Sequence, residues 1–248
     1  MPDDHYSYAA YADPAMASSF DAKRFGGPIG KILLDDQERV LDEFLGDVSG
    51  RKVLDMATGT GRAALALAKR GAFVTGVDAS REMLKVAAAR AADARLSIEF
   101  VEGDAHALTF PDRWFQATVC LRMLMHVPDW RRALSELCRV TEHRLVIDYP
   151  ALGSVAVVQA LWRRAALSMG RNVEAYRVFN AGDVARELDR HRFRITAVHK
   201  QFVLPIAIHK AVGSPAFTRG VERMLAGAGM LRLAGSPVTI TAVRCASS

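Results

Sequence analysis

The sequence predicts an α/β fold built on a doubly wound, mostly parallel sheet. Between residues 52 and 149, short apolar segments typical of strands alternate with segments of helical periodicity, which is the pattern of βαβ units. A glycine-containing turn directly follows the first strand segment and opens the first helix of this series. The 248 residues are 50 % hydrophobic and 24 % charged, which is typical of a globular chain that can bury a large core.

An N-terminal helical arm is expected before the sheet. Residues 1–30 are rich in Tyr, Ala, Gly and Pro, and from Ile29 to Leu45 the apolar residues recur on one helix face. The first strand is expected at 52–56, and an Ala- and Leu-rich helix follows at 63–69. A glycine shortly after this helix is a typical stop signal.

The following segments repeat the alternation of strand and helix. Ser80 is a typical N-cap for a helix at 81–92, and Pro and Asp open a helix at 128–140. The strands that complete the parallel part of the sheet are expected at 73–77, 97–102, 116–121 and 144–149.

Beyond residue 150 we expect helical stretches at 153–167 and 181–190, and two late strands at 194–200 and 238–245. The late strands are expected to close the sheet as a hairpin-like edge with an antiparallel edge strand, which makes a Rossmann-like sheet of about seven strands. No internal repeat or obvious linker divides the chain, so a single domain is predicted.

Composition predicts a soluble, cytoplasmic protein. The three cysteines lack metal-ligand spacing, so neither a disulfide framework nor a metal site is expected, and a reducing compartment is favoured. The first twenty residues contain no Lys or Arg, unlike a secretory signal. The longest uncharged apolar run, 151–162, is much shorter than the ~20 residues of a membrane-spanning helix.

The net charge of +6 is unevenly distributed along the chain. Residues 163–248 contain 14 Lys and Arg against 5 Asp and Glu, a net +9, whereas residues 1–162 contain 19 against 22, a net −3. Such a split is typical of contact with an acidic partner, a membrane surface or a nucleic acid, and equally of a solvated basic surface.

The most informative segment is the turn after the first strand. Its glycines, Gly59 and Gly61, allow the backbone to approach a ligand closely. Asp78 stands 19 residues after Gly59, at the end of the second strand, where a carboxylate can accept hydrogen bonds from both hydroxyls of a ribose. Asp104 follows the third strand and can accept from an adenine amino group. The structural alternatives are a helix cap for Asp78 and a plain turn for Asp104.

Two nucleotide-like ligands fit this pattern. Gly59 to Ala64 match the G-x-G-x-x-A dinucleotide fingerprint, which would indicate an NAD-dependent oxidoreductase. Asp55 opposes that interpretation, because a carboxylate beside the turn repels a phosphate, and Asp104 adds an acidic contact that a pyrophosphate site does not need. A cationic nucleoside with an amino-acid tail, S-adenosylmethionine, fits better.

Four motifs of the chain resemble the class I S-adenosylmethionine-dependent methyltransferases. They are VLDMATGTGRAALALA (53–68), VTGVDASREML (74–84), VEGDAHALTFPDRWFQATVC (101–120) and LRMLMHVPDWRRALSELCRV (121–140). The Ala-Thr-Gly-Thr-Gly form of the turn is similar to the branch that contains ubiquinone and menaquinone biosynthesis methyltransferases. The sequence departs from the family pattern at Gln116, a position that is often Asp, and at residues 141–144, where a glycine pair is usual.

The resemblance implies S-adenosylmethionine as cofactor and assigns ten residues to it. The methionine and ribose portions are assigned to Asp55, Ala57, Gly59 and Gly61, the ribose diol to Asp78, the adenine to Ala79, Met83, Asp104 and Ala105, and the sulfonium region to Leu121.

Methyl transfer from a sulfonium is an in-line displacement, in which the enzyme mainly aligns the reacting groups. A base is needed only if the acceptor must lose a proton. After the fourth and fifth strands, His126 is a candidate base, Tyr149 a candidate partner of the acceptor and Arg122 a candidate site for an anionic group. Capping or packing is the alternative for His126 and Tyr149. In the arm, Tyr11 and Arg24 are candidate contacts of a lid with the substrate or the methionine carboxylate.

The predicted function is therefore methyl transfer from S-adenosylmethionine to a small-molecule or lipid-like acceptor. The helical stretch from Leu152 to Leu167 has two interpretations, an apolar acceptor pocket or membrane-surface contact, and a lid helix packed on the sheet. An RNA methyltransferase is the alternative that the basic C-terminal third raises, but the sequence has no aromatic-interleaved basic stripe, so no nucleic-acid partner is expected. A cofactor-binding protein without catalysis is a third hypothesis.

With these roles the single domain, 1–248, divides into four parts. They are an N-terminal arm or lid (1–48), a cofactor-binding core (49–150), a substrate and lid insertion with a late strand (151–215) and a C-terminal helix and strand (216–248). The identity of the acceptor, the methylated atom and the oligomeric state stay open at this point.

Overall fold

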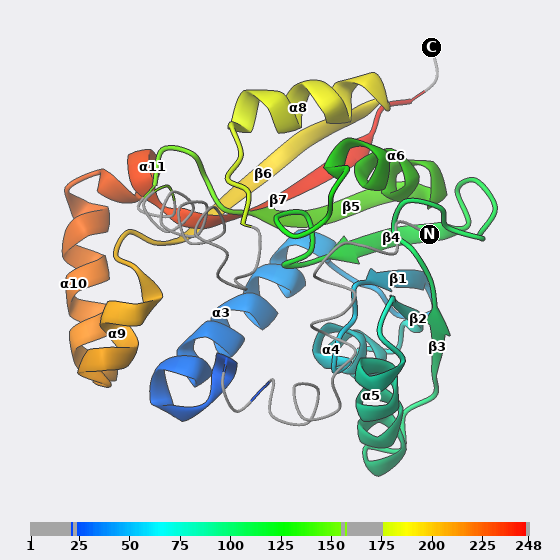
Figure 1. Cartoon of the computed structure of the whole chain (residues 1–248), viewed down its shortest axis with the longest axis horizontal. Coiled ribbons are helices and arrows are strands. Elements are labelled where there is room, and N and C mark those ends of the chain that lie inside the picture. Colours follow the sequence, from blue (N-terminus) through cyan, green and yellow to red (C-terminus); the bar gives the residue numbers. More distant parts are fainter. Residues whose placement is uncertain (1–20, 22–23, 155–156, 158–175, 247–248) are drawn as a thin grey trace, which may run out of the picture.

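A seven-stranded sheet forms the centre of the computed structural model, which describes residues 21, 24–154, 157 and 176–246. The strand order is β3-β2-β1-β4-β5-β7-β6 (Figure 1). The strands are β1 (Lys52–Met56), β2 (Phe73–Asp78), β3 (Ile98–Glu102), β4 (Phe115–Cys120), β5 (Thr141–Tyr149), β6 (Phe193–Phe202) and β7 (Ser236–Arg244). Pairs among β1 to β5 are parallel, and β7 is antiparallel to both of its neighbours, β5 and β6. The predicted Rossmann-like α/β class is thus confirmed, with the antiparallel strand inserted next to the edge strand β6.

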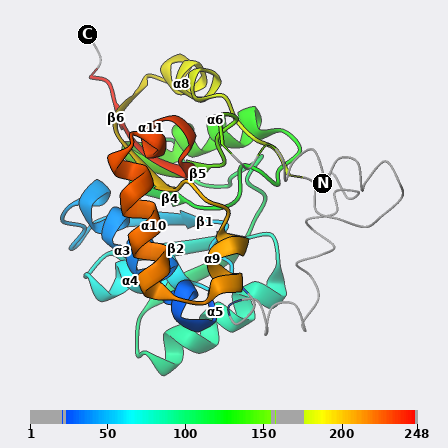
Figure 2. The same ribbon diagram turned by 90° about the vertical axis from the view of Figure 1, so that its left-hand side faces the viewer.

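Helices cover both faces of the sheet. One face is covered by α3 (Gly27–Leu45), α4 (Arg62–Lys69) and α5 (Arg81–Asp93), and the other by α6 (Trp130–Val140) and α8 (Ala181–Arg190) (Figure 1). Between β6 and β7 lie α9 (Ile206–Val212), α10 (Pro215–Gly227) and α11 (Met230–Ala234), which stand together beside the end of the sheet (Figure 2). Because helices cover the central strands on both sides, the sequences of these strands are continuous apolar runs and do not alternate between apolar and polar residues.

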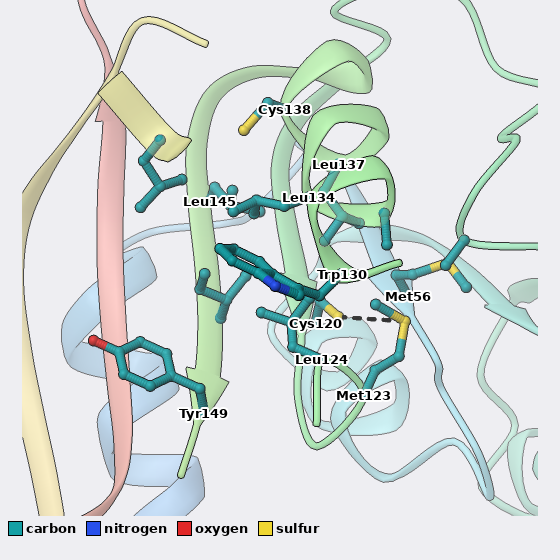
Figure 3. Packing of buried hydrophobic residues seen from close by; sticks show 14 of the residues in the cluster. Met56, Cys120, Met123, Leu124, Trp130, Leu134, Leu137, Cys138, Leu145 and Tyr149 are labelled. Atoms are coloured by element: carbon teal, nitrogen blue, oxygen red, sulfur yellow. Dashed lines mark hydrogen bonds between the residues drawn. The ribbon is translucent and has the colours of Figure 1, made fainter. Parts of the chain in front are cut away.

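The largest core cluster lies between α6 and the central strands. Trp130, Leu134 and Leu137 of α6 point toward Cys120 of β4 and Leu145 of β5 (Figure 3). Leu134, Leu137 and Leu145 are each fully buried. This packing holds α6 on the sheet and thereby determines where the loop between β4 and α6 begins and ends.

The junction between α6 and β5 differs from the expected one. A strand was predicted from residue 144, but β5 begins at Thr141, immediately after α6 ends at Val140. The Thr141 hydroxyl donates to the Leu137 carbonyl oxygen at 2.6 Å and lies 2.6 Å from the Thr118 hydroxyl of β4. The Thr141 side chain thus caps the last turn of α6 and also connects the start of β5 to β4. These contacts explain how the helix can end here without the glycine pair that is usual in the family.

The segments beyond residue 150 agree only in part with the expected ones. The helix at 181–190 and both late strands are present nearly as predicted. The structure also contains three separate helices, α9, α10 and α11, that the sequence did not predict individually. The predicted helix at 153–167 lies almost wholly outside the described residues. Of the helices that the structure describes, none is both long and apolar enough to cross a membrane.

Candidate active site

A cavity of about 1100 Å³, open to solvent, lies at the carboxyl ends of the parallel strands. Its walls come from the turns that follow β1, β2, β3 and β4, together with Arg24 of the arm and Gln37 of α3. Open α/β sheets bind ligands at this edge, where the order of the strands reverses. The described residues around it therefore form the candidate site.

The turn after β1 is held by a buried carboxylate. Asp55 Oδ2 accepts hydrogen bonds from the Thr58 hydroxyl at 2.6 Å and from the Ala64 backbone N–H of α4 at 3.0 Å. Only 2 % of Asp55 is exposed, and this burial raises the pKa of Asp55 to about 6 in spite of those hydrogen bonds. Asp55 lines the cavity, but its carboxylate also fastens the turn to the helix.

The two glycines of the turn have different surroundings. Both are left-handed, with φ of 55° at Gly59 and 80° at Gly61, which glycine adopts at little cost. A Cβ at Gly59 would meet nothing within 4 Å, and Gly59 lines the cavity. A Cβ at Gly61 would lie 2.9 Å from the Ala87 Cβ of α5, and Gly61 does not line the cavity. Gly59 thus leaves room for a ligand, and Gly61 leaves room for a neighbouring helix.

Asp78 joins the turn after β1 to the end of β2. Asp78 Oδ2 accepts from the Gly59 backbone N–H at 2.8 Å, and Asp78 Oδ1 accepts from the Ser80 backbone N–H at 2.9 Å. Burial raises the pKa of Asp78, and backbone donors oppose the shift. Ser80, rather than Asp78, caps α5, because the Ser80 hydroxyl accepts from the Met83 N–H at 3.2 Å. Asp78, Ala79 and Met83 all line the cavity.

The turn after β3 places its residues differently from the prediction. Gly103 and Ala105 line the cavity, but Asp104 does not. Asp104 Oδ1 instead accepts from the His106 backbone N–H at 2.9 Å and lies 2.7 Å from His106 Nδ1. His106, which the sequence reasoning did not single out, competes for this carboxylate because it follows only two residues later.

Arg122 follows β4 at the far end of the cavity. Its φ of 62° is unusual for a residue with a side chain, and its backbone N–H donates to Asp148 Oδ1 of β5. Burial, with Arg24 nearby, lowers the pKa of Arg122 to about 10, although Asp148 acts in the opposite direction. Leu121 and His126 lie on the same wall, and His126 is buried, with its ring 6.2 Å from that of Tyr176.

Alternation along β5 decides which of two neighbouring residues reaches the site. Asp148 bonds to Arg122 and lines a second cavity next to the first. Tyr149 points to the opposite face of the sheet and is buried in the core, with its ring 5.8 Å from Phe179 (Figure 3). The structure does not bring Tyr149, a candidate partner of the acceptor, to either cavity, because neither is lined by it.

The arm contributes residues that the motifs did not indicate. Asp21 accepts from the Thr60 hydroxyl at 3.1 Å and pairs with Arg62 at 3.4 Å and with Arg90 of α5. Arg62 also lies over the Phe25 ring, 3.5 Å from its centroid. Of the two predicted arm contacts, Arg24 lines the cavity and Tyr11 lies outside the described residues. No local signal in the sequence connects Asp21 to residues 39 and 69 positions away.

The described residues also bear on a metal site and on a dinucleotide site. Among the described residues, no group of three or more His, Cys, Asp or Glu side chains is arranged to hold a metal ion. The strand order 3-2-1-4-5-7-6, with β7 antiparallel, also differs from the 3-2-1-4-5-6 order of the dinucleotide-binding fold. This topology disfavours the NAD-dependent oxidoreductase that the glycine pattern alone allowed.

Comparison with known proteins finds a similarity over the first five strands. The family profile described as "Methyltransferase domain" matches residues 53–144, from β1 to β5. Residues 53–144 are thus similar to a methyltransferase domain, and the motifs that resemble class I methyltransferases lie within or next to this stretch. The cavity lies at the carboxyl ends of the strands in the matched residues.

Curated relatives of this stretch include enzymes of quinone biosynthesis. A demethylmenaquinone methyltransferase of Thermus thermophilus is 39 % identical over 105 residues, which are 40 % of this chain and 48 % of the relative. A ubiquinone biosynthesis O-methyltransferase of Alkalilimnicola ehrlichii is 36 % identical over 133 residues, which are 50 % and 54 % of the two chains. The chain spans about half the length of the curated relatives it matches.

Solved structures share the fold over most of the chain. Magnesium protoporphyrin IX methyltransferase from Synechocystis PCC 6803, with S-adenosylhomocysteine bound, has a TM-score of 0.62 at 19 % identity, covering 91 % of this chain and 88 % of that one. The [4+2]-cyclase SpnF has a TM-score of 0.61 at 21 % identity, covering 86 % and 81 %. Because a cyclase and a methyltransferase both share the fold, the fold by itself does not determine the reaction.

Proposed function

We propose that this protein is an S-adenosylmethionine-dependent methyltransferase that acts on a small-molecule acceptor. The observation that carries the proposal is the contact between the glycine turn and the second strand. Asp78 accepts from the Gly59 N–H at the wall of an open cavity, within the residues that match the methyltransferase profile. A carboxylate in this position is suited to a ribose diol.

The residues around the cavity fit the proposed cofactor. The open space above Gly59 admits a ligand against the backbone, and Asp78 lines the same cavity, held in place by the Gly59 and Ser80 N–H groups. Ala79, Met83 and Ala105 supply small and apolar walls suited to the adenine. For the methionine portion we propose Asp55, Ala57 and Leu121. Gly61 and Asp104 do not line the cavity and support it indirectly. Gly61 leaves room for α5 to pack, and Asp104 holds His106.

When bound, the cofactor supplies a methyl group on a sulfonium, which is attacked in line by the acceptor. The residues of this chain align the two reactants and exclude water, which is the main contribution a protein makes to such a displacement. Leu121, Met123 and Val127 form an apolar wall where that alignment takes place. His126 lies on the same wall and is the residue positioned to accept a proton from an acceptor that carries one. Tyr149 has no role in this proposal.

The acceptor class rests on the relatives. The names of the curated relatives describe quinone-type acceptors, and we propose a small or lipid-like molecule of that general kind for this chain. No observation on the described residues favours RNA. Peripheral membrane contact, a cytoplasmic location and the four-part division of the chain stay predictions.

The binding of S-adenosylhomocysteine, measured by calorimetry, tests the proposal. In Asp78→Asn, one carboxylate oxygen becomes an amide donor and the negative charge is lost, so we expect S-adenosylhomocysteine to bind about tenfold or more weakly. Asp189→Asn, at an exposed position on α8, is the matched control and should bind like the parent protein. If the parent protein does not bind S-adenosylhomocysteine, the proposed function is wrong. If Asp78→Asn binds it as tightly as the parent, only the ribose assignment is wrong.

A further inference from the structure

Large apolar side chains are exposed on the helices that connect β6 to β7. Of the ten that are exposed among the described residues, six lie on α9, α10 and α11: Ile208, Val212, Phe217, Met224, Met230 and Leu233. Met224 is 65 % exposed and Leu233 is 79 % exposed. The three helices stand together at one side of the molecule, which faces the viewer in Figure 2. Exposed apolar side chains gathered in this way are typical of a surface that binds a partner.

Three arginines on the same helices have no carboxylate partner in the part of the chain that the structure describes. Arg219 and Arg223 of α10 and Arg232 of α11 are exposed, and none of the three forms an ion pair with a described residue. The arginines of α8, by contrast, pair with carboxylates one turn away. We call the three arginines, together with the six apolar side chains, the α9–α11 surface.

The one acidic residue between β6 and β7, Glu222, is turned away from solvent. Its side chain is only 11 % exposed. Its carboxylate accepts from the backbone N–H groups of Val203 and Leu204 at 2.8 and 3.0 Å, and it lies 3.0 Å from His209 Nε2. The negative charge of Glu222 is therefore used inside the fold, and the charges that this connection presents to solvent are positive.

Helical spacing separates the apolar and the basic side chains of α10. Phe217 and Met224 are seven residues apart and share one stripe of the helix, and Arg219 and Arg223, four residues apart, share another. Thr218 is 1 % exposed and marks the side that packs on the protein. The exposed side of α10 thus has apolar side chains along one flank and arginines along the other, which is the pattern of a helix that lies in the plane of a membrane surface.

The neighbouring helix α3, which α10 contacts, adds little negative charge. Asp35 pairs with Lys31 at 2.9 Å, and Asp36 pairs with Arg39 at 2.7 Å. The other carboxylates of α3 also pair with arginines, apart from Glu38, which has no ion pair with a described residue. The three arginines of the α9–α11 surface therefore outnumber the unpaired carboxylates on the adjoining helix.

We propose that the α9–α11 surface binds the surface of an anionic lipid bilayer. The apolar side chains, Met224 and Leu233 above all, enter the boundary between the head groups and the acyl chains, and the arginines pair with lipid phosphates. The two kinds of side chain thus meet the two layers of the lipid that suit them. This inference goes beyond the proposed function, because docking on a bilayer requires neither the cofactor nor the acceptor.

Two other occupants fit the α9–α11 surface less well. A second copy of the chain, docked through the same surface about a two-fold axis, would bring arginines toward arginines without an exposed carboxylate from α9, α10 or α11 between them. A nucleic acid would pair with the arginines, but it binds exposed side chains chiefly by stacking bases on aromatic rings, and aliphatic side chains such as Met230 and Leu233 would stay in water.

The α9–α11 surface is also connected to the candidate active site. Lys210 of α9 donates from Nζ to the Arg24 carbonyl oxygen at 2.8 Å, and Arg24 lines the cavity. One of the three docking helices therefore touches a residue of the cavity wall. This connection suits the lipid-like acceptor proposed above, which would reach the cavity from the bilayer.

Co-sedimentation with lipid vesicles tests this inference. The parent protein is titrated with vesicles of phosphatidylcholine alone, or of phosphatidylcholine mixed with phosphatidylglycerol. We expect the anionic vesicles to bind about tenfold more tightly or better, and sodium chloride to weaken this preference. Arg219→Gln/Arg223→Gln should lose most of the preference. Met224→Ser/Leu233→Ser should weaken binding to the anionic vesicles about tenfold, because two apolar side chains no longer enter the lipid.

The matched control is Arg51→Gln/Phe73→Ser. These two residues are exposed at the amino ends of β1 and β2, and Phe73 is 68 % exposed. The control removes one exposed arginine and one exposed apolar side chain outside the α9–α11 surface. It should bind both kinds of vesicle as the parent protein does.

Three results would overturn the inference. They are no binding of the parent protein to anionic vesicles, equal binding to both kinds of vesicle, and a control variant that loses as much binding as the two surface variants. A parent protein that is dimeric by light scattering and becomes monomeric in Met224→Ser/Leu233→Ser would also overturn it, since a second copy would then cover the surface. If a double variant does not fold, the single variants Arg223→Gln and Leu233→Ser decide the result.

The vesicle experiment is independent of the proposed function. A protein that binds anionic vesicles but not S-adenosylhomocysteine would contradict the proposed function and support the docking surface. A protein that binds S-adenosylhomocysteine but not the vesicles would do the reverse.

Discussion

Replacing Asp55 by Asn should change how the stability of the protein depends on pH. Asp55 is a buried carboxylate whose oxygen holds the glycine turn through Thr58 and Ala64. Burial raises the pKa of Asp55 from an ordinary value of 3.8 to about 6. The folded protein therefore holds this proton more tightly than the unfolded chain does. Consequently, the contribution of Asp55 to stability falls as the pH rises from about 4 to about 6.

The size of the effect follows from the shift. A rise of about 2 pKa units corresponds to about 3 kcal/mol, at about 1.4 kcal/mol per unit, once the pH is above both pKa values. Between pH 4 and pH 7.5 about 2 kcal/mol of this is lost, because part of the titration is complete below pH 4. In Asp55→Asn this loss is absent. Therefore, the free energy of unfolding of the variant minus that of the parent protein should rise by about 2 kcal/mol between pH 4 and pH 7.5.

Urea denaturation of both proteins at pH 4 and pH 7.5 measures the difference. Any constant penalty from the amide group cancels when the two pH values are compared, and Asp189→Asn controls for the loss of one exposed charge. In thermal melts the same change corresponds to a relative shift of about 5 °C for a chain of this size. A difference between variant and parent that stays constant with pH, or that changes in the opposite direction, would refute the assignment of a raised pKa to Asp55.

Three further substitutions separate packing from ligand binding. Both Gly59→Ala and Gly61→Ala place a side chain at a positive φ, at about 1–2 kcal/mol each, but only at Gly61 does the new Cβ meet Ala87 at 2.9 Å. We expect Gly61→Ala to lower the melting temperature more, and Gly59→Ala to weaken the binding of S-adenosylhomocysteine more in calorimetry. The reverse order would contradict the roles given to the two glycines. Leu137→Ala, on the buried face of α6, should lower the free energy of unfolding in urea by about 2–5 kcal/mol without changing the affinity for S-adenosylhomocysteine. A loss below about 1 kcal/mol would show that the core around Leu137 is not tightly packed.

The predicted parts of the site are those that strand order alone brings together. Consecutive parallel strands end at one edge of a sheet, so the turn after β1 and Asp78 at the end of β2 were expected to meet. The 2.8 Å contact from the Gly59 N–H to Asp78 shows that they do. The family resemblance assigned Ala105 and Leu121 to the cofactor, and both line the cavity. The contact between Gly59 and Asp78 follows from backbone topology, which apolar periodicity makes visible in the sequence.

Other parts of the site were not predictable from local patterns. Asp104 was expected at an adenine edge, but its carboxylate bonds to His106, a choice between two local partners that spacing does not decide. Tyr149 and Asp148 are neighbours, and the side of the sheet that each faces depended on the register of β5 beside β4 and β7. Lys210 and Arg24 are 186 positions apart, so only the folded chain shows their contact.

By itself, the sequence determined the α/β class, the sheet and the place of the ligand-binding edge, because hydrophobic periodicity and glycine turns act over a few residues at a time. Only the tertiary structure decided which charges share the cavity. Electrostatic contacts such as those of Arg122 with Arg24 and Asp148 depend on distance in space and on burial, neither of which is written in the order of residues along the chain.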